Sequence, residues 1–163
     1  MADRLRLRDA GREDLRLVLR FIRALAEYER LAHEVRADEA TLARFLFEEP
    51  RRAEALIAEW DGEPVGFAVW YYSFSTFIGR PSLYVEDVFV DPALRGKGIG
   101  TAIFGHLASR ALAQGCGRME WSVLDWNAPS IAFYRAIGAK PREGWTLQQL
   151  TGDALAALAA RQG

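Results

Sequence analysis

Hydrophobic residues repeat along the chain with two different periods, and their order predicts alternating strands and helices. Residues 4–8 alternate arginine and leucine, the period-two pattern of a half-buried edge strand. Over residues 11–31 the apolar positions recur at steps of three and four, with Glu13 and Asp14 in the first turn, which predicts an amphipathic helix. A shorter helix is predicted over 37–47, before Pro50.

The middle of the chain predicts a hairpin followed by a strand–helix–strand unit. Apolar runs at 53–60 and 65–72 flank the turn sequence Asp-Gly-Glu-Pro, so the two runs should pair antiparallel. A strand over 82–90, a glycine-rich turn, a helix over about 97–114 and a strand over 118–124 follow. This order predicts a parallel pair joined by a right-handed crossover.

The C-terminal part predicts two more helices and one more strand. Asn127 suits the N-cap of a helix that runs to Ile137, and Gly138 suits the residue just past its end. A last strand is predicted over 145–150 and a terminal helix over 153–160. Because there is no internal repeat, linker or low-complexity stretch, residues 1–163 are predicted to form a single α/β domain with a mixed sheet.

Composition and charge narrow the classes of function. Of the 163 residues half are hydrophobic, and the net charge is −1 with both signs intermixed, so no nucleic-acid partner is expected. One cysteine and two histidines offer no cluster with metal-ligand spacing, so no metal is expected. The N-terminus has no signal-peptide pattern and no apolar run approaches the ~20 residues of a membrane span. We therefore expect no membrane association and a cytoplasmic protein.

The segment Arg-Gly-Lys-Gly-Ile-Gly at 95–100 is the strongest candidate for a binding site. It lies between a predicted strand and a predicted helix, where glycines permit close backbone approach and helix amides point at an anion. Arg95 and Lys97 add positive charge for a diphosphate. The segment is neither a P-loop, which needs lysine after the last glycine, nor a dinucleotide fingerprint, which Thr101 breaks. A flexible turn with solvated charges is the alternative interpretation.

Two adjacent carboxylates, Glu86 and Asp87, interrupt an otherwise apolar strand. Strict alternation along a strand places them on opposite faces of the sheet. If the strand is central, at least one carboxylate is costly to bury unless it is paired, and such sites are often functional. An exposed edge position or an ion pair with one of the arginines is the alternative.

The motifs together resemble the GNAT superfamily of acetyltransferases. Arg95, Gly98 and Gly100 match its pyrophosphate motif [QR]-x-x-G-x-[GA], and residues 127–134 followed by Gly138 look like its second coenzyme-binding segment. Segments at 25–29, 66–68, 78–79, 84–87 and 143–145 are similar to the spermidine/spermine acetyltransferase group. The resemblance implies a mixed, mostly antiparallel sheet with a splayed central parallel pair, flanked by helices.

The resemblance also implies roles for individual residues. The catalytic residues would be Tyr134, which protonates the leaving thiolate, and Glu86, which binds the amine and passes its proton outward. The coenzyme would be bound by Val88, Phe89, Val90, Arg95, Gly96, Lys97, Gly98, Ile99, Gly100, Thr101, Asn127, Pro129 and Ser130. The amine would be bound by Tyr28, Glu29, Glu86, Asp87, Glu120, Trp121 and Glu143. Packing for Tyr134, and solvated surface charge for Glu29, Glu120 and Glu143, are the structural alternatives.

The activity implied by the resemblance is direct transfer of an acetyl group from acetyl-CoA to a primary amine of a small cationic substrate such as a polyamine, a diamine or a thialysine-like amino acid. The group is commonly homodimeric. Two departures from its pattern stand out: Ile137 replaces a possible basic coenzyme contact, and the segment 140–143 is shorter than in eukaryotic members. Acetylation of peptides or proteins, and acetyl-CoA sensing without turnover, are the alternative functions.

Overall fold

The computed structural model describes residues 4–162, and the chain divides at Asn127 into two units. The first unit holds the sheet and its flanking helices, and the second unit, from Ala128 onward, holds the C-terminal helices. Each unit is described by itself below. A single domain over 1–163 stays a prediction, and its outermost residues, 1–3 and 163, lie outside the described part of the chain.

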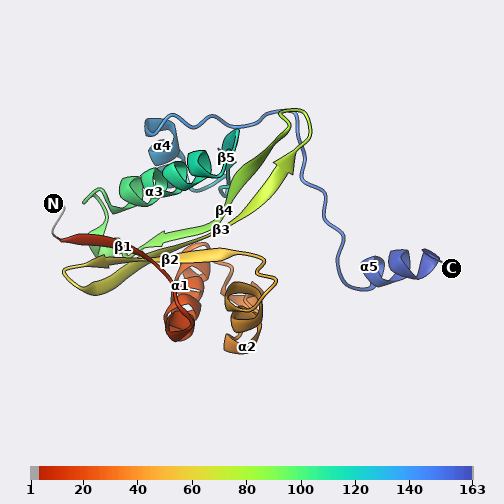
Figure 1. Cartoon of the computed structure of the whole chain (residues 1–163), viewed down its shortest axis with the longest axis horizontal. Helices are drawn as coiled ribbons and strands as arrows, with labels where there is room; N and C mark the ends of the chain where they lie inside the picture. The colour runs from red at the N-terminus through yellow and green to blue at the C-terminus, as the bar shows by residue number, and fades with distance from the viewer. Residues whose placement is uncertain (1–3, 163) are drawn as a thin grey trace. The chain divides into compact units, whose positions relative to one another are not determined.

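The first unit is built on one five-stranded sheet whose strands follow the order of the chain (Figure 1). The strands are β1 (Leu5–Asp9), β2 (Glu54–Trp60), β3 (Glu63–Ser75), β4 (Arg80–Val90) and β5 (Arg118–Glu120). Neighbours from β1 to β4 pair antiparallel, whereas β4 and β5 pair parallel. The predicted mixed, mostly antiparallel sheet is therefore confirmed.

Helices cover both faces of this sheet. In Figure 1, α1 (Leu15–Tyr28) and α2 (Glu39–Leu42) lie on one side and α3 (Ile99–Ala113) lies on the other. Two of these helices differ from their predicted bounds: residues Arg12–Asp14 form a separate 3-10 turn before α1, and α2 continues as a π-helical turn, Ala43–Phe47. The layers agree with the expected α/β architecture.

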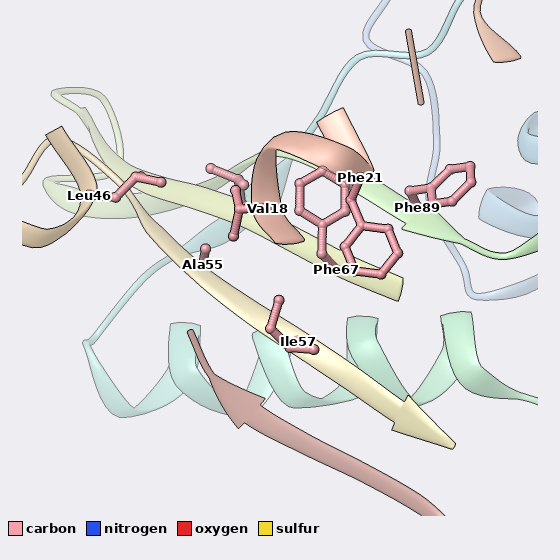
Figure 2. Close-up of a cluster of buried hydrophobic side chains, with 8 residues drawn as sticks. Val18, Phe21, Leu46, Ala55, Ile57, Phe67 and Phe89 are labelled. Atoms are coloured by element: carbon pink, nitrogen blue, oxygen red, sulfur yellow. The ribbon is translucent and has the colours of Figure 1, made fainter. Parts of the chain in front are cut away.

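A hydrophobic cluster fixes α1 on its face of the sheet (Figure 2). Phe21 of α1 stacks on Phe67 of β3, with ring centroids 5.4 Å apart, and contacts Phe89 of β4 at 6.1 Å. Val18 and Ile57, both fully buried, belong to the same cluster. Because Phe89 is part of this core, the end of β4 packs against α1.

The parallel pair separates soon after it begins. Pairing between β4 and β5 extends only from Ser82 opposite Arg118 to Tyr84 opposite Glu120. β4 continues to Val90, whereas the residues that follow Glu120 are not strand, so the predicted strand over 118–124 is shorter than expected. Beyond Tyr84, β5 therefore leaves the backbone of β4 unpaired on that side, as a splayed pair requires.

The second unit contains α4 (Ala128–Ala136), α5 (Gly152–Ala159) and a final 3-10 turn, Ala160–Gln162. Gly138 has a φ of +94°, and the amides of Gly138 and Ala139 donate to the carbonyls of Arg135 and Tyr134, which confirms the predicted glycine C-cap. None of the helices over residues 4–162 is long and apolar enough to span a membrane.

The predicted strand over 145–150 is wrong. This stretch has no regular structure, and its side chains Trp145 and Leu147 are 73% and 88% exposed. A strand needs a partner for its backbone, and the second unit, as far as the structure describes it, holds no other strand. Local sequence pattern favoured a strand here, but no pairing within the unit supports one.

Gly66 on β3 is expected to tolerate no side chain. A β-carbon at this position would lie 2.6 Å from the carbonyl oxygen of Phe89 on β4, closer than real contacts allow. Replacing Gly66 by Ala should therefore destabilise the protein by about 1 to 3 kcal/mol, through strain between the two strands. Chemical denaturation measures this loss. The change Gly105→Ala, at a helical position with open space around it, is the control and should not destabilise. An unchanged midpoint for Gly66→Ala would contradict the expectation.

Candidate active site

The glycine-rich turn joins the end of β4 to the start of α3. Gly96 and Gly98 have φ angles of +79° and +80°, a left-handed conformation that residues with a β-carbon rarely adopt. Gly98 is the N-cap of α3, so the following amides of Ile99, Gly100 and Thr101 belong to the first helical turn, where they have no intrahelical acceptor. With the helix dipole, this arrangement suits a diphosphate. Binding of the coenzyme diphosphate by these residues stays a prediction.

Both cationic side chains of the turn lie over aromatic rings. The guanidinium of Arg95 is 4.6 Å from the ring centroid of Tyr28, and Arg95 Nε donates to the carbonyl oxygen of Val90 at 3.3 Å. The ammonium of Lys97 is 5.7 Å from the ring centroid of Trp60. Each cation is thus held at the edge of the turn by a cation–π contact.

Tyr28 also contacts Asn127, the first residue of the predicted second coenzyme-binding segment. Its hydroxyl donates to Oδ1 of Asn127 at 3.3 Å, and its ring lies 6.2 Å from the ring of Trp126. Asn127 is only 6% exposed, and its backbone amide donates to the carbonyl of Leu124 at 2.9 Å. The structure therefore brings together two predicted coenzyme residues, Arg95 and Asn127, through a residue that the resemblance had placed in the amine site.

A β-bulge at Glu86 interrupts the regular pairing of β3 with β4. Asp87 lies opposite Val69 and Val85 lies opposite Trp70, so Glu86 is the extra residue and has no partner on β3. The expectation that the two carboxylates point to opposite faces assumed strict alternation, which the bulge interrupts, so that expectation stays a prediction. The charge of Glu86 adds to the effect of burial in raising the pKa of Asp87.

Three carboxylates from two elements form what we call the acidic group: Glu29, Glu86 and Asp87. Burial raises the pKa of Asp87 to about 6, and the neighbouring charges of Glu86 and Glu29 add to this shift. Burial also raises the pKa of Glu29, which follows the last residue of α1. A cation placed among these groups would relieve their repulsion, so the acidic group is suited to an ammonium ion.

Sequence reasoning missed the aromatic residues beside the acidic group. The rings of Tyr71 on β3 and Tyr84 on β4 are 5.1 Å apart, and the hydroxyl of Tyr84 lies 2.9 Å from the hydroxyl of Ser122. The pKa of Tyr71 is raised by burial and by the charge of Glu86. Only the register of β3 on β4 reveals these neighbours, so no local sequence signal could have identified them.

The other three residues predicted to bind the amine are Glu120, Trp121 and Glu143. Arg118 Nε lies 2.8 Å from Glu120 Oε1, so this carboxylate already has a cationic partner, which neither the amine-site prediction nor the solvated-charge alternative anticipated. Trp121 packs edge-on against Phe104, with ring centroids 4.8 Å apart. Glu143 is exposed in the second unit. Binding of the amine by these three residues stays a prediction.

The second unit carries Tyr134, Pro129 and Ser130 on α4. Tyr134 is half-buried, and its ring contacts that of Phe133 edge-on at 5.6 Å. Their proposed roles, an acid for the leaving thiolate and coenzyme contacts, stay predictions.

Other potential catalytic groups are not set up for chemistry. Cys116 is buried, and burial raises the pKa of its thiol, which disfavours the nucleophilic thiolate. His106 accepts a hydrogen bond from Arg110 Nε at 3.0 Å, and burial lowers its pKa. No group of three or more potential metal-binding side chains occurs among residues 4–162.

The sequence model of the Acetyltransferase (GNAT) family matches residues 18–139, a span that includes the turn, the acidic group and α4. The chain belongs to the GNAT family of acetyltransferases. Both the predicted family and the predicted enzyme class are therefore confirmed, and this family uses acetyl-CoA as its acetyl donor.

Individual relatives agree with this assignment. The chain is 39% identical to the thialysine N-epsilon-acetyltransferase of Bos taurus, covering 95% of this chain and 97% of the relative. It is 31% identical to the human spermidine/spermine N(1)-acetyltransferase-like protein 1, over 94% of this chain but only 23% of that longer protein. Among solved structures, an integron cassette protein from the mobile metagenome of V. cholerae superposes on this GNAT protein with a TM-score of 0.77, 28% identity and coverage of 95% and 97%.

Proposed function

We propose that this GNAT enzyme transfers the acetyl group of acetyl-CoA to a primary amine of a small cationic substrate, with a thialysine-type amino acid as the first candidate and a polyamine as the second. The acidic group of Glu29, Glu86 and Asp87 is the observation that carries the proposal, because such a group selects a cation. Similarity to thialysine and spermidine/spermine-type acetyltransferases over nearly the whole chain supports it.

The coenzyme half of the site uses the turn at 95–100 and the segment that begins at Asn127. The amides of the first turn of α3, together with Arg95 and Lys97, would bind the diphosphate of acetyl-CoA. The backbone of Val88–Val90, which β5 leaves unpaired, would bind the pantetheine arm and the thioester carbonyl. Pro129 and Ser130 on α4 complete the proposed set.

The amine half has to supply a neutral nucleophile. An alkyl ammonium has a pKa near 10.4, so presenting the neutral amine at pH 7 costs about 4 to 5 kcal/mol. Glu86 would take the proton directly or through water, while Asp87 and Glu29 hold the cationic substrate. The amine nitrogen then forms a bond to the thioester carbon and loses its remaining extra proton to solvent, the carbon–sulfur bond breaks, and Tyr134 donates a proton to the departing thiolate and regains one from solvent.

A substrate panel tests the proposal. Release of free thiol from acetyl-CoA would be followed with thialysine, lysine, ornithine, putrescine, spermidine, spermine and a basic peptide. We expect saturable turnover with at least one small diamine or diamino acid and little with the peptide. Turnover of the peptide alone would favour a protein acetyltransferase, and binding of acetyl-CoA without any turnover would favour a sensor.

The pH dependence of the reaction should report on Asp87. Because its pKa is raised to about 6, the carboxylate is charged and attracts the amine above pH 6 but is neutral below. We expect kcat/KM for the amine to fall below a midpoint near pH 6, and Asp87→Asn to remove this limb of the profile and raise KM. The folded protein holds the proton of Asp87 more tightly than the unfolded chain does. The free energy of unfolding should therefore decrease as the pH rises from about 4 to about 6.

The same substitution gives an independent check on stability. Asp87→Asn should stabilise the protein at pH 7.5, by up to about 3 kcal/mol, because it removes a carboxylate that is costly to ionise in place. Urea denaturation at pH 4 and pH 7.5 measures the difference. An acid limb that persists unchanged in Asp87→Asn would assign it to another member of the acidic group.

Two further expectations concern the state of the enzyme in its cell. We propose a homodimer and a cytoplasmic location, as the resemblance and the sequence suggest. Light scattering of the purified protein tests the first, and fractionation of the source cells tests the second.

A further inference from the structure

Tyr28 contacts both parts of the proposed coenzyme site at once. We infer that Tyr28 is a positioning residue for acetyl-CoA: its ring holds Arg95 beside the glycine-rich turn, and its hydroxyl fixes the amide of Asn127. The resemblance gave this tyrosine only a place in the amine site. Both observed contacts instead lead to coenzyme residues.

The first contact restricts a side chain that would otherwise move freely. Arg95 is exposed and lies in a turn whose glycines adopt left-handed conformations, so its own backbone does little to direct its guanidinium. Two contacts direct it: the hydrogen bond from Nε to the carbonyl of Val90 and the stack on Tyr28 at 4.6 Å. A cation that is already held in place loses less freedom when an anion binds, which increases affinity.

The second contact orients an amide at the start of the other coenzyme segment. Asn127 is buried, its backbone amide is bound to Leu124, and its Oδ1 accepts the hydrogen bond from Tyr28. Because Oδ1 points toward Tyr28, the amide nitrogen points away from it. Removing the hydroxyl would delete this hydrogen bond to Oδ1 without creating a large cavity.

Tyr28 itself is held firmly enough to act as a support. It is the last residue of α1, and the helix end is closed by hydrogen bonds from Leu31 to Ala26 at 2.8 Å and from Arg30 to Glu27 at 3.1 Å. The hydrophobic cluster around Phe21 fixes the same helix on the sheet. The position of α1 on the sheet therefore fixes the position of the Tyr28 ring beside Arg95 of the glycine-rich turn.

Binding of acetyl-CoA to the full chain, measured by calorimetry without any amine, tests the inference. Tyr28→Phe keeps the ring and loses the hydroxyl, so the Kd should rise about 3-fold to 10-fold. Tyr28→Leu loses the stack as well and should weaken binding by a further factor of about 2 to 5. Tyr72→Phe, which removes a tyrosine hydroxyl on β3 outside the proposed coenzyme and amine sites, is the control and should leave the Kd unchanged.

A double-mutant cycle separates positioning from general destabilisation. If the ring acts through Arg95, the difference between Tyr28→Phe and Tyr28→Leu should largely disappear in an Arg95→Ala background. Additive effects, an unchanged Kd or tighter binding in Tyr28→Leu would each overturn the inference. A raised KM for the amine with an unchanged Kd for acetyl-CoA would return Tyr28 to the amine site. Because no amine is present in the binding measurement, the result stands whether or not the proposed substrate class is correct.

Discussion

Replacing Tyr134 by Phe is expected to lower kcat by about 100-fold to 10,000-fold, the range that a positioned general acid contributes. Collapse of the tetrahedral intermediate releases a thiolate, and a phenol hydroxyl would supply the proton or hydrogen bond that stabilises it. The substitution removes one oxygen and keeps the ring, which contacts Phe133 edge-on. Steady-state thiol release with saturating amine and acetyl-CoA measures the effect.

The dependence on the leaving group gives this prediction its sharpest control. With a thioester whose thiol is more acidic, the departing thiolate needs less help, so the loss in Tyr134→Phe should shrink. The Kd of acetyl-CoA should remain close to that of the wild type. Tyr72→Phe, on β3, is the matched substitution and should retain full activity. A deficit in Tyr134→Phe that appears only as weaker coenzyme binding would contradict a role as an acid.

Local sequence patterns were sufficient to predict much of the fold and the glycine-rich turn at 95–100. Gly96 and Gly98 adopt left-handed conformations that few other residues accept. The presence of glycine at these positions is therefore itself a signal of the backbone conformation of the turn. The hairpin turn at 61–64 and the glycine after α4 are equally local. In each case the sequence signal acts within a few residues, and the structure agrees.

The structural features that could not be predicted from the sequence depend on contacts between residues far apart in the chain. The bulge at Glu86 arises from the register of β4 on β3, which alternation within β4 alone does not predict. The hydrogen bond from Tyr28 to Asn127 joins residues 99 positions apart. The stretch 145–150 shows the converse case, since its local pattern favours a strand that nothing in its unit pairs with.

These long-range contacts also change the interpretation of the candidate residues. Glu120 and Asp87 are both carboxylates on the parallel pair of strands, yet Glu120 has an arginine partner at 2.8 Å whereas Asp87 is partly buried beside like charges. The charge of Glu120 is neutralised by Arg118 within the protein. The groups that shift the pKa of Asp87 include no cation, which is why the amine is proposed to bind there.

Replacing Glu86 by Gln is expected to lower kcat/KM for the amine by about 100-fold at pH 7. The substitution preserves shape at an exposed position outside the regular register of β3 and β4, so the fold should be unaffected. It removes the proposed acceptor for a proton whose loss costs about 4 to 5 kcal/mol at this pH. Because that cost falls as the pH approaches 10, the activity of Glu86→Gln should recover steeply with rising pH. A pH–rate profile from pH 6 to 10 measures this recovery.

The comparison of three variants identifies which carboxylate accepts the proton. Glu27→Gln, an exposed position on α1 that follows the buried Ala26, is the control and should behave as the wild type. If Glu86 is the acceptor, Glu86→Gln should lower kcat, whereas Asp87→Asn should mainly raise KM. The reverse pattern would make Asp87 the acceptor, and its raised pKa would then favour proton transfer because it is closer to that of the amine. Equal loss in both would mean that the pair shares the proton across the bulge, with Glu86 and Asp87 acting as one unit.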